Sequence, residues 1–388
     1  MNEQKNDGLV MVNENKLRNL LLHFLRSVMW GEELDTHFLP LNEQEWQWLF
    51  ATASCHTVES VVFDVVSSLP ESLRPCKTLM MVWKKRVEDQ EQEHIRQLRT
   101  VNYLYARFQS SGITPVVLKG IDLAACYPCP SHRYSGDIDL FYCSVEIKNA
   151  ADDVIEGWGN YLERNLNHES VFMVGNVVVE NHGLLFRSHN PLVSDRSKKR
   201  LQTALASPEA YCRTEILGSD ILTVSPELNL LQLVQHAYMH VINSGIGLRQ
   251  LVDIALFLKN RHDKIDKQKF FCWASEWKMT EWTRCLMSLL VRHLNMPVEF
   301  SPVEIATSKN ADRLMSEVWL TGNFGMGDSR FIVSPNSNSK KTTLKRLLHN
   351  YCLFARYSCG EATGSFLKLV KERIKETVIK MLDNSRAV

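Results

Sequence analysis

The sequence predicts an α+β protein in which a small mixed β-sheet lies between an N-terminal and a C-terminal helical lobe. Three observations predict this arrangement. Apolar residues recur at helical spacing in the first part of the chain, short β-branched runs follow between residues 114 and 180, and helical periodicity returns after about residue 207. The predicted domains are an N-terminal helical lobe at 1–111, an α/β core at 112–206, a helical lobe at 207–324, and a linker with C-terminal helices at 325–388.

The composition is that of an ordinary soluble globular protein. The 388 residues are 45% hydrophobic and 23% charged, and 45 basic against 44 acidic side chains leave a net charge of +1. This balance argues against a surface that binds long nucleic acid, which needs a basic excess. The polar N-terminus lacks a secretory signal, and no stretch approaches the ~18 apolar residues of a membrane span. We therefore expect a cytoplasmic protein without membrane contact, whose ten cysteines are reduced.

The N-terminal lobe is predicted to contain three helices. Leucines and phenylalanine recur at helical spacing over residues 15–30, and a second apolar pattern covers residues 43–66. A long charged pattern over residues 79–110 carries its apolar stripe near its end. That pattern ends at Ser111-Gly112, a combination typical of a helix C-terminus.

The central part changes from helical to strand periodicity. Residues 114–118 and 137–142 are predicted strands, with a short helix at 122–127 and a proline-rich loop between them. A helix is predicted over 145–162. Two further strands, 170–174 and 177–180, flank Gly175-Asn176, which favours a hairpin turn. Helices then dominate: one begins at Ser225-Pro226 and runs to 242, one covers 248–259, two or more lie within 267–293, a linker or mobile loop covers 325–340, and C-terminal helices cover 342–382.

Paired carboxylates in the second strand carry the first functional hypothesis. Residues two apart in a strand point to one face, so Asp137 and Asp139 project together, about 7 Å apart. Neighbouring carboxylates repel and raise each other's pKa unless a cation lies between them. A divalent cation such as Mg²⁺ takes oxygen ligands and leaves room for phosphates. Glu180, which ends the run Val177-Val178-Val179, is the candidate third carboxylate. The alternative is an edge strand whose acidic residues face water.

The order of these motifs resembles a known superfamily. Leu118-Lys119-Gly120, then R-x-x-x-D-I-D-L from Arg133, then the V-E-x-H strand at Glu180, is similar to polymerase β-type nucleotidyltransferases. Within that superfamily the chain resembles the bacterial family called uncharacterised nucleotidyltransferases. EWQWLFATASCHTVESVVFDVV and HAYMHVINSGIGLRQLVDIALFL resemble its N-terminal and downstream helical patterns, so that the resemblance covers about residues 15–260.

The resemblance implies roles for individual residues. It implies that Asp137 and Asp139 hold Mg²⁺ or Mn²⁺, that Glu180 assists the nucleophile or binds metal, and that Gly120 approaches the triphosphate of an NTP. The chain departs from many relatives because Lys119-Gly120-Ile121 lacks the small hydroxyl that touches phosphate. Lys119 or Arg133 could supply a cation instead, or either could be a solvated loop charge. Ser135 is counted with these nucleotide-binding candidates.

Two downstream helices carry further candidates. His236 and His240 belong to a polar stripe, which could face solvent, form half of a metal site, or line a cleft opposite the strands, as the resemblance implies. Arg249 and Asp253 could form an intrahelical ion pair, or could face the nucleotide and orient its binding group. We therefore predict that this helical lobe packs across the carboxylates, with His236 or Arg249 within one ligand's width of Asp137.

These observations predict a metal-dependent enzyme that moves a nucleoside monophosphate from an NTP to an acceptor, with release of pyrophosphate. The acceptor could be a small molecule or a protein side chain. The alternative is an inactive nucleotide-binding or regulatory module with the same fold.

Overall fold

A mixed β-sheet organises the fold and confirms the predicted α+β class. The computed structural model describes residues 13–158, 162–165, 169–216, 219–305, 309–328, 330, 339–368, 370 and 371. The strands in these residues are β1 (Val116–Leu118), β2 (Asp137–Phe141), β3 (Leu162–Asn165), β4 (Glu169–Val174), β5 (Val177–His182), β6 (Tyr211–Ile216) and β7 (Ser219–Val224). They form one sheet in the order β3-β4-β5-β2-β1-β7-β6.

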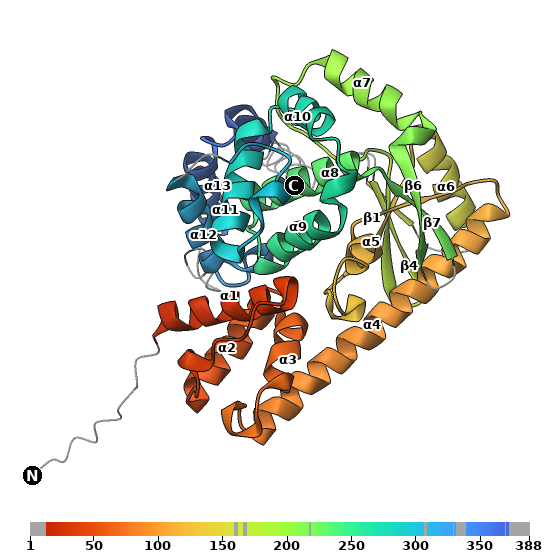
Figure 1. The fold of residues 1–388 in the computed structure, drawn as a ribbon. Helices are drawn as coiled ribbons and strands as arrows, with labels where there is room; N and C mark the ends of the chain where they lie inside the picture. The colour runs from red at the N-terminus through yellow and green to blue at the C-terminus, as the bar shows by residue number, and fades with distance from the viewer. Residues whose placement is uncertain are drawn as a thin grey trace, which may run out of the picture.

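Four helices of the N-terminal part pack beside the sheet and the downstream helices. They are α1 (Glu14–Trp30), α2 (Glu43–Cys55), α3 (Glu59–Ser68) and α4 (Lys77–Gln109). Figure 1 shows α1, α2 and α3 grouped at one end of α4, whose other end reaches the sheet. The predicted stop of α4 is confirmed, because Gly112 has φ +69° and the Ile113 N–H donates to the Phe108 carbonyl at 3.1 Å.

The single helix predicted over 43–66 is wrong. It is broken after α2, where Thr57 adopts φ +52°. The reason is a tertiary contact: the backbone N–H of Arg249 donates to the His56 carbonyl at 3.3 Å, and that of Leu248 donates to His56 Nδ1 at 3.2 Å. The turn thus serves as the docking point for a helix almost 200 residues later, which local periodicity cannot show.

The sheet is larger than the sequence predicts. The hairpin of β4 and β5 around Gly175 is confirmed. However, α6 (Val145–Gly157) ends before residue 162, where β3 begins. Helical structure does not return at 207 either: β6 and β7 form a hairpin, and β7 pairs in parallel with β1 through Val116 and Leu222. The sheet therefore extends beyond the 112–206 range predicted for the core; the division into domains otherwise stays a prediction.

Helices dominate the rest of the chain. They are α5 (Gly120–Ala124) and α7 (Asp195–Leu205) within the sheet region, and then α8 (Pro226–Asn243), α9 (Leu248–Arg261), α10 (Lys267–Glu276), α11 (Thr280–Leu294), α12 (Lys309–Thr321) and α13 (Ser339–Phe354), with a further helical stretch at 359–368.

The sequence did not predict α12. Ser225 does precede α8, but its side chain forms no capping bond. Most of the predicted 325–340 linker, and the predicted helices beyond residue 371, lie outside the described residues.

Two hydrophobic cores hold these layers together. One lies between the sheet and the helices α4 and α6, and includes Phe108, Tyr142 and Phe172. The other joins α1–α3 to the downstream helices and includes Phe24, Trp83 and Trp282. Figure 1 shows α8 and α9 on the other side of the sheet from α4 and α6, next to α5. The face of the sheet that carries the predicted carboxylates is therefore the one next to α8 and α9.

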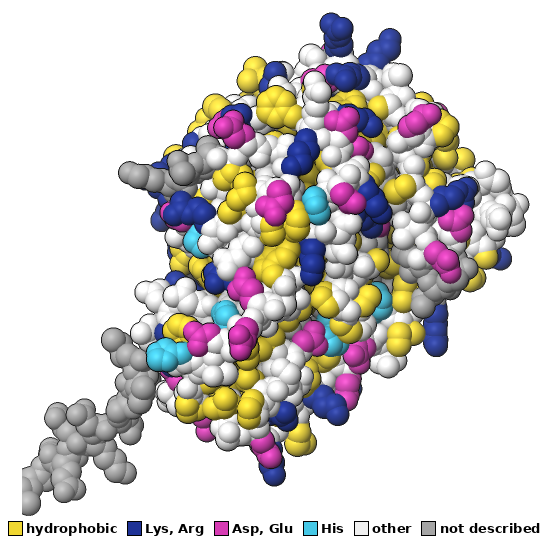
Figure 2. Space-filling view, viewed as in Figure 1, with side chains coloured by type: hydrophobic (Ala, Val, Ile, Leu, Met, Phe, Trp, Pro, Cys, Tyr) yellow, Lys and Arg dark blue, Asp and Glu magenta, His cyan; other side chains and the backbone are white. Residues whose placement is uncertain are grey.

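No helix among the described residues is both long and apolar enough to cross a membrane. On the face of the molecule shown in Figure 2, basic and acidic side chains are scattered among one another rather than gathered by sign.

Candidate active site

Two neighbouring parallel strands bring the predicted carboxylates to one face of the sheet. In the register of β2 and β5, Asp137 pairs with Val178 and Asp139 pairs with Glu180. The alternate residues Ile138 and Val179 point the other way, into the core beneath α4 and α6. Since a one-residue slip would expose these apolar side chains, burial fixes the register that aligns Asp139 with Glu180.

A buried network fixes the strand that carries Glu180. The adjacent Asn181 is fully buried and donates from Nδ2 to Asp152 Oδ1 at 2.8 Å, while Tyr142 Oη donates to Asn181 Oδ1 at 3.3 Å. Asp152 also accepts hydrogen bonds from Lys148 and Ser170, each at 2.7 Å. These polar groups form their hydrogen bonds with one another on the face of the sheet away from the cavity. The network therefore fixes β5, which presents Glu180 and His182 on its other face.

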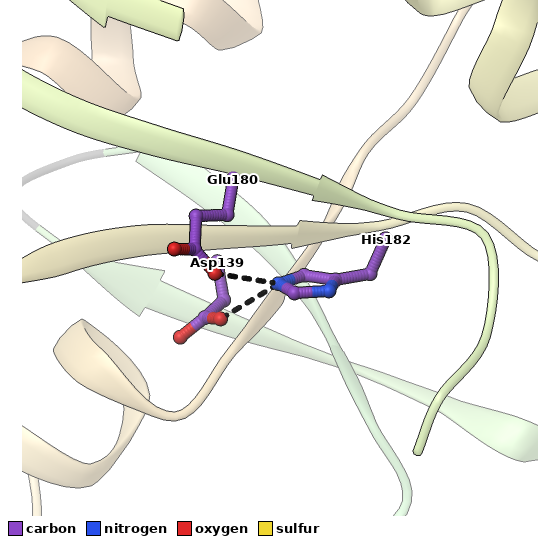
Figure 3. A group of neighbouring side chains, drawn as sticks. All are labelled: Asp139, Glu180 and His182. Carbon is purple, nitrogen blue, oxygen red and sulfur yellow. Dashed lines mark hydrogen bonds and ion pairs between the residues drawn. The ribbon is translucent and has the colours of Figure 1, made fainter. Parts of the chain in front are cut away.

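Asp139 is surrounded by cationic groups. Its Oδ1 lies 3.0 Å from Lys119 Nζ and 2.8 Å from His182 Nε2, and the same imidazole nitrogen lies 3.5 Å from Glu180 Oε2. Figure 3 shows the His182 ring directed at both carboxylates. Burial favours the neutral acid, but the nearby Lys119 and His182 outweigh it and hold the pKa of Asp139 well below its usual range.

The contact that lowers the pKa of Asp139 raises the pKa of His182. Burial lowers the pKa of His182, but its hydrogen bonds to Asp139 and Glu180 outweigh burial and raise the pKa to about 9. The imidazole is therefore protonated at neutral pH and donates from Nε2. The V-E-x-H pattern contains His182, but the sequence alone assigned it no role in the site. The spacing of two along β5 was the signal that could have included it.

Asp137 is in the opposite electrostatic situation. It is half-buried at the start of β2, and burial together with the nearby carboxylates of Asp139 and Glu180 raises its pKa to about 6. Lys119 offsets this only in part. Burial and repulsion between the neighbouring carboxylates thus act in the same direction on Asp137.

The turn before α5 shapes the floor of the site. Lys119 has φ +48° and Gly120 has φ +25°, a region that side chains rarely adopt. A Cβ on Gly120 would lie 3.4 Å from Ser135 Oγ and 3.6 Å from the Asp137 carbonyl oxygen. Ser135 Oγ itself donates to that carbonyl at 3.2 Å. Glycine thus provides the required backbone angle and lets the turn lie close against the start of β2.

One cavity of about 430 Å³ joins the sheet face to the helices α8 and α9. This volume lies in the usual range for small-ligand sites. All the site residues predicted from the sequence line it: Lys119, Gly120, Arg133, Ser135, Asp137, Asp139, Glu180, His236, Arg249 and Asp253. The helical lobe therefore does pack across the carboxylates, and the edge-strand and solvated-stripe alternatives do not describe these residues.

The structure places Arg133 and Asp253 differently from the expected nucleotide contacts. Arg133 is only 3% exposed and bonds Asp253 through two parallel contacts, Nε to Oδ1 at 2.8 Å and Nη2 to Oδ2 at 3.0 Å. Tyr127 Oη donates to the same Oδ1 at 2.7 Å. Arg249 reaches Asp253 at only 3.5 Å and donates from Nε to Thr57 Oγ1 at 3.2 Å. Asp253 is thus primarily the partner of Arg133 and only secondarily of Arg249.

Asp253→Ala is expected to lower the free energy of unfolding by about 3–5 kcal/mol, because it leaves the buried Arg133 guanidinium without its counter-ion. Urea unfolding measures this loss. Asp220→Ala is the matched control: the Asp220–Arg213 pair is 58% and 66% exposed and should contribute less than about 1 kcal/mol. Similar losses in the two variants would show that the Arg133–Asp253 pair is not a structural link.

The histidine pair on α8 is half-buried and neutral. His236 Nε2 lies 2.9 Å from His240 Nε2, and the rings meet edge to face. Burial, reinforced by the positive charge of Lys119, lowers the pKa of His240 to about 4 and that of His236 well below its ordinary value. The two Nε2 atoms are therefore bonded to each other, one as donor and one as acceptor, instead of being directed at a shared metal.

A second donor set fits a metal better. Ligand atoms of Asp139, Glu180 and His182 lie within 4.8 Å of one another, and Asp137 lies outside this group. Two carboxylates suit a hard divalent cation such as Mg²⁺ or Mn²⁺, whereas the protonated His182 could bind a metal only after losing its Nε2 proton. The cavity also contains residues that sequence reasoning did not include, among them Tyr134, Gln250 and Phe324.

A match to a family model supports the motif-based resemblance. A family model described as uncharacterised nucleotidyltransferase matches residues 42–295. None of the curated proteins compared with the chain matches it. The crystal structure of an antigenic nucleotidyltransferase-like protein from Paracoccidioides brasiliensis is similar at a TM-score of 0.33 with 14% identity, over 54% of this chain and 94% of the other.

Proposed function

Because the chain belongs to the family described as uncharacterised nucleotidyltransferases, we propose that it transfers a nucleoside monophosphate from an NTP to an acceptor and releases pyrophosphate. One observation carries this proposal. Asp139 faces Glu180 across two parallel strands, with Asp137 beside them, in a cavity that also contains Lys119 and Arg249. Such a site combines ligands for a cation, cations for phosphates and a base for a hydroxyl group.

A divalent metal, Mg²⁺ or Mn²⁺, is part of the proposal. Asp137 and Asp139 supply oxygen ligands, and Glu180 beside Asp139 is either a third ligand or the base for the acceptor. Burial and the nearby carboxylates raise the pKa of Asp137, and a bound cation would lower it again. When bound, such an ion neutralises charge on the transferring phosphate and on the leaving pyrophosphate. The protonated His182 and Lys119 balance the charge of Asp139 in the structure described here.

Basic side chains of the cavity are proposed to bind the triphosphate. Lys119 projects from the turn at Gly120, where the backbone can approach a phosphate closely. Arg249 has five N–H donors, and its contacts to Thr57 and Asp253 use two of them. Its guanidinium therefore retains donors for a phosphate, while Arg133, committed to Asp253, is proposed to position Arg249 rather than to touch the nucleotide.

Glu180 is proposed to act as the base for the acceptor. The acceptor oxygen forms a new bond to the α-phosphorus, the bond between the α-phosphorus and the bridging oxygen breaks, and pyrophosphate leaves with that electron pair. The proton of the acceptor hydroxyl passes to Glu180. A small molecule or a protein side chain is the proposed acceptor, which fits the near-neutral net charge and the mixed surface of Figure 2 better than long nucleic acid does.

Pyrophosphate release tests this function. The purified chain is incubated with each of the four NTPs, Mg²⁺ or Mn²⁺ and candidate acceptors, and the expected result is metal-dependent release that a chelator abolishes. Binding of an NTP without release, across small-molecule and protein acceptors, would support the alternative of a regulatory module with the same fold. Absence of metal-dependent NTP binding would overturn both functions.

A further inference from the structure

A glycine-rich turn after α12 places an aromatic ring at the cavity. Residues 322–327 read Gly-Asn-Phe-Gly-Met-Gly, and Phe324 adopts φ +52° between Gly322 at +62° and Gly325 at +76°. A bulky side chain in this region of backbone space is strained. Such strain persists where the surroundings impose it, and it is concentrated at ligand sites.

The surroundings of the turn impose its conformation. A Cβ on Gly322 would lie 2.4 Å from Cys55 Sγ, and one on Gly325 would lie 2.6 Å from the Ser244 carbonyl oxygen. Asn323 is buried and accepts a hydrogen bond from Gln250 Nε2 at 2.8 Å. The turn is thus packed between the end of α2, the end of α8 and the start of α9.

The Phe324 ring, in contrast to the preceding Asn323, is not buried. It is 54% exposed, lines the cavity and contacts His240 edge to face, with ring centroids 4.8 Å apart. Folding ordinarily buries a phenylalanine. Here a fixed turn holds an aromatic ring with much of its surface open at a cavity wall, which is the arrangement of a stacking surface for a planar ligand.

The two sides of the cavity differ in character. The sheet side carries the carboxylates of Asp137 and Asp139 together with Lys119. The helical side carries aliphatic groups and the Phe324 ring beside the polar residues of α8 and α9, which are His236, His240, Arg249, Gln250 and Asp253. An NTP also has two unlike ends, a charged triphosphate and a flat base whose faces can stack on an aromatic ring. The apolar wall residues are Leu233 and Ala237 of α8 and Ile254 of α9.

We propose that Phe324 is the platform on which the nucleobase stacks, while the triphosphate lies toward Lys119 and the carboxylates. This inference rests on the proposed function, because that function supplies an NTP as ligand. It goes beyond the family assignment, since Phe324 lies outside the matched residues 42–295.

The same geometry assigns a preference among bases. Gln250, the amide side chain among the cavity residues, already donates to Asn323 and accepts from the Gly247 N–H at 3.0 Å, and the His236–His240 pair is bonded internally. Stacking rather than hydrogen bonding therefore holds the base. Because purines offer a larger face than pyrimidines, ATP and GTP are the substrates that this surface favours over CTP and UTP.

Binding measurements with three ligands test the platform. Calorimetric titrations of the full chain with Mg²⁺ and ATP, CTP or inorganic triphosphate are compared for the wild type, Phe324→Ala and Phe324→Trp. We expect Phe324→Ala to weaken ATP binding about tenfold to a hundredfold, as loss of a base-stacking side chain does elsewhere, and to remove the preference for ATP over CTP. Phe324→Trp should bind ATP at least as tightly as the wild type.

Inorganic triphosphate separates the stacking role from a structural one. Because it carries the charge of the nucleotide but no base, Phe324→Ala should bind it as the wild type does. Met326→Ala is the control within the turn, since Met326 is 61% exposed and does not line the cavity. Unchanged ATP binding by Phe324→Ala, or equal weakening of ATP and triphosphate, would overturn the platform alone. A wild type that binds neither ligand with metal would overturn the proposed function, and the platform with it.

Discussion

Asp137→Asn is expected to abolish metal-dependent NTP binding and transfer, and yet to raise the melting temperature of the chain in a chelator. The loss follows from removing a ligand charge at unchanged shape, and we expect kcat/KM to fall about 10³-fold or more. The gain follows from electrostatics: burial and the nearby carboxylates raise the pKa of Asp137 to about 6. An ionised Asp137 therefore opposes folding, and asparagine removes this repulsion.

The difference in stability between Asp137→Asn and the wild type depends on pH. The folded-state pKa of Asp137 lies above the ordinary value of 3.8, so the cost of ionising it develops as the pH rises from about 4 to about 6. Asp137→Asn lacks this cost and should be about 1–3 kcal/mol more stable than the wild type at neutral pH without metal. Below about pH 4 both side chains are neutral, and the two proteins should unfold alike.

Addition of Mg²⁺ or Mn²⁺ should reverse the order. The metal binds the folded wild type and raises its melting temperature, whereas Asp137→Asn gains little. Asp220→Asn is the control, because Asp220 is 58% exposed and lies outside the cavity. If Asp137→Asn is no more stable than the wild type in chelator, then Asp137 is not held in repulsion; if both proteins gain equally from metal, then Asp137 is not a ligand.

The sequence could identify the catalytic face because its signal is local. The period of two along β2 places Asp137 and Asp139 together, and the apolar residues Ile138 and Val179 fix which face is buried. The hairpin at Gly175 likewise needs only two residues in the right order. Where the pattern and the turn chemistry agree within a few residues, the structure follows the prediction.

Long-range contacts account for what the sequence did not show. The partner of Asp253 is Arg133, 120 residues away, so the spacing of four to Arg249 suggested the weaker of its two ion pairs. The break between α2 and α3 depends on the docking of α9 onto His56. Phe324 was overlooked because its glycine-rich surroundings are typical of a linker, although packing against α2 and α8 fixes that turn.

A similar limit applies to β6 and β7. β6 is an edge strand with exposed Arg213 and Glu215, and only the parallel pairing of β7 with β1 makes the hairpin part of the sheet. That pairing joins Val116 to Leu222 across more than a hundred residues, which no local pattern encodes. The pairing of β7 with β1 matters for the site because β1 leads directly into the turn at Lys119 and Gly120.

Glu180→Gln is expected to leave NTP binding nearly unchanged and to lower kcat about 10²–10⁴-fold, the usual effect of losing a general base. The substitution keeps the size of the side chain, and the network of Asn181, Asp152 and Tyr142 holds β5 in place without help from Glu180. Binding and turnover should therefore separate. Stopped assays of pyrophosphate release give kcat, and calorimetry with Mg²⁺ and the preferred NTP gives the dissociation constant.

The separation also decides between the two roles open to Glu180. A base for the acceptor acts only in the chemical step, so kcat falls while the dissociation constant stays within about threefold. A metal ligand contributes to the bound state, so Glu180→Gln would then weaken binding of NTP with metal by about tenfold or more. Glu215→Gln is the matched control, because Glu215 is an exposed residue of β6 outside the cavity. If Glu180→Gln turns over like Glu215→Gln, then Glu180 has no part in the reaction, and the base must be sought among the other groups that face Asp139.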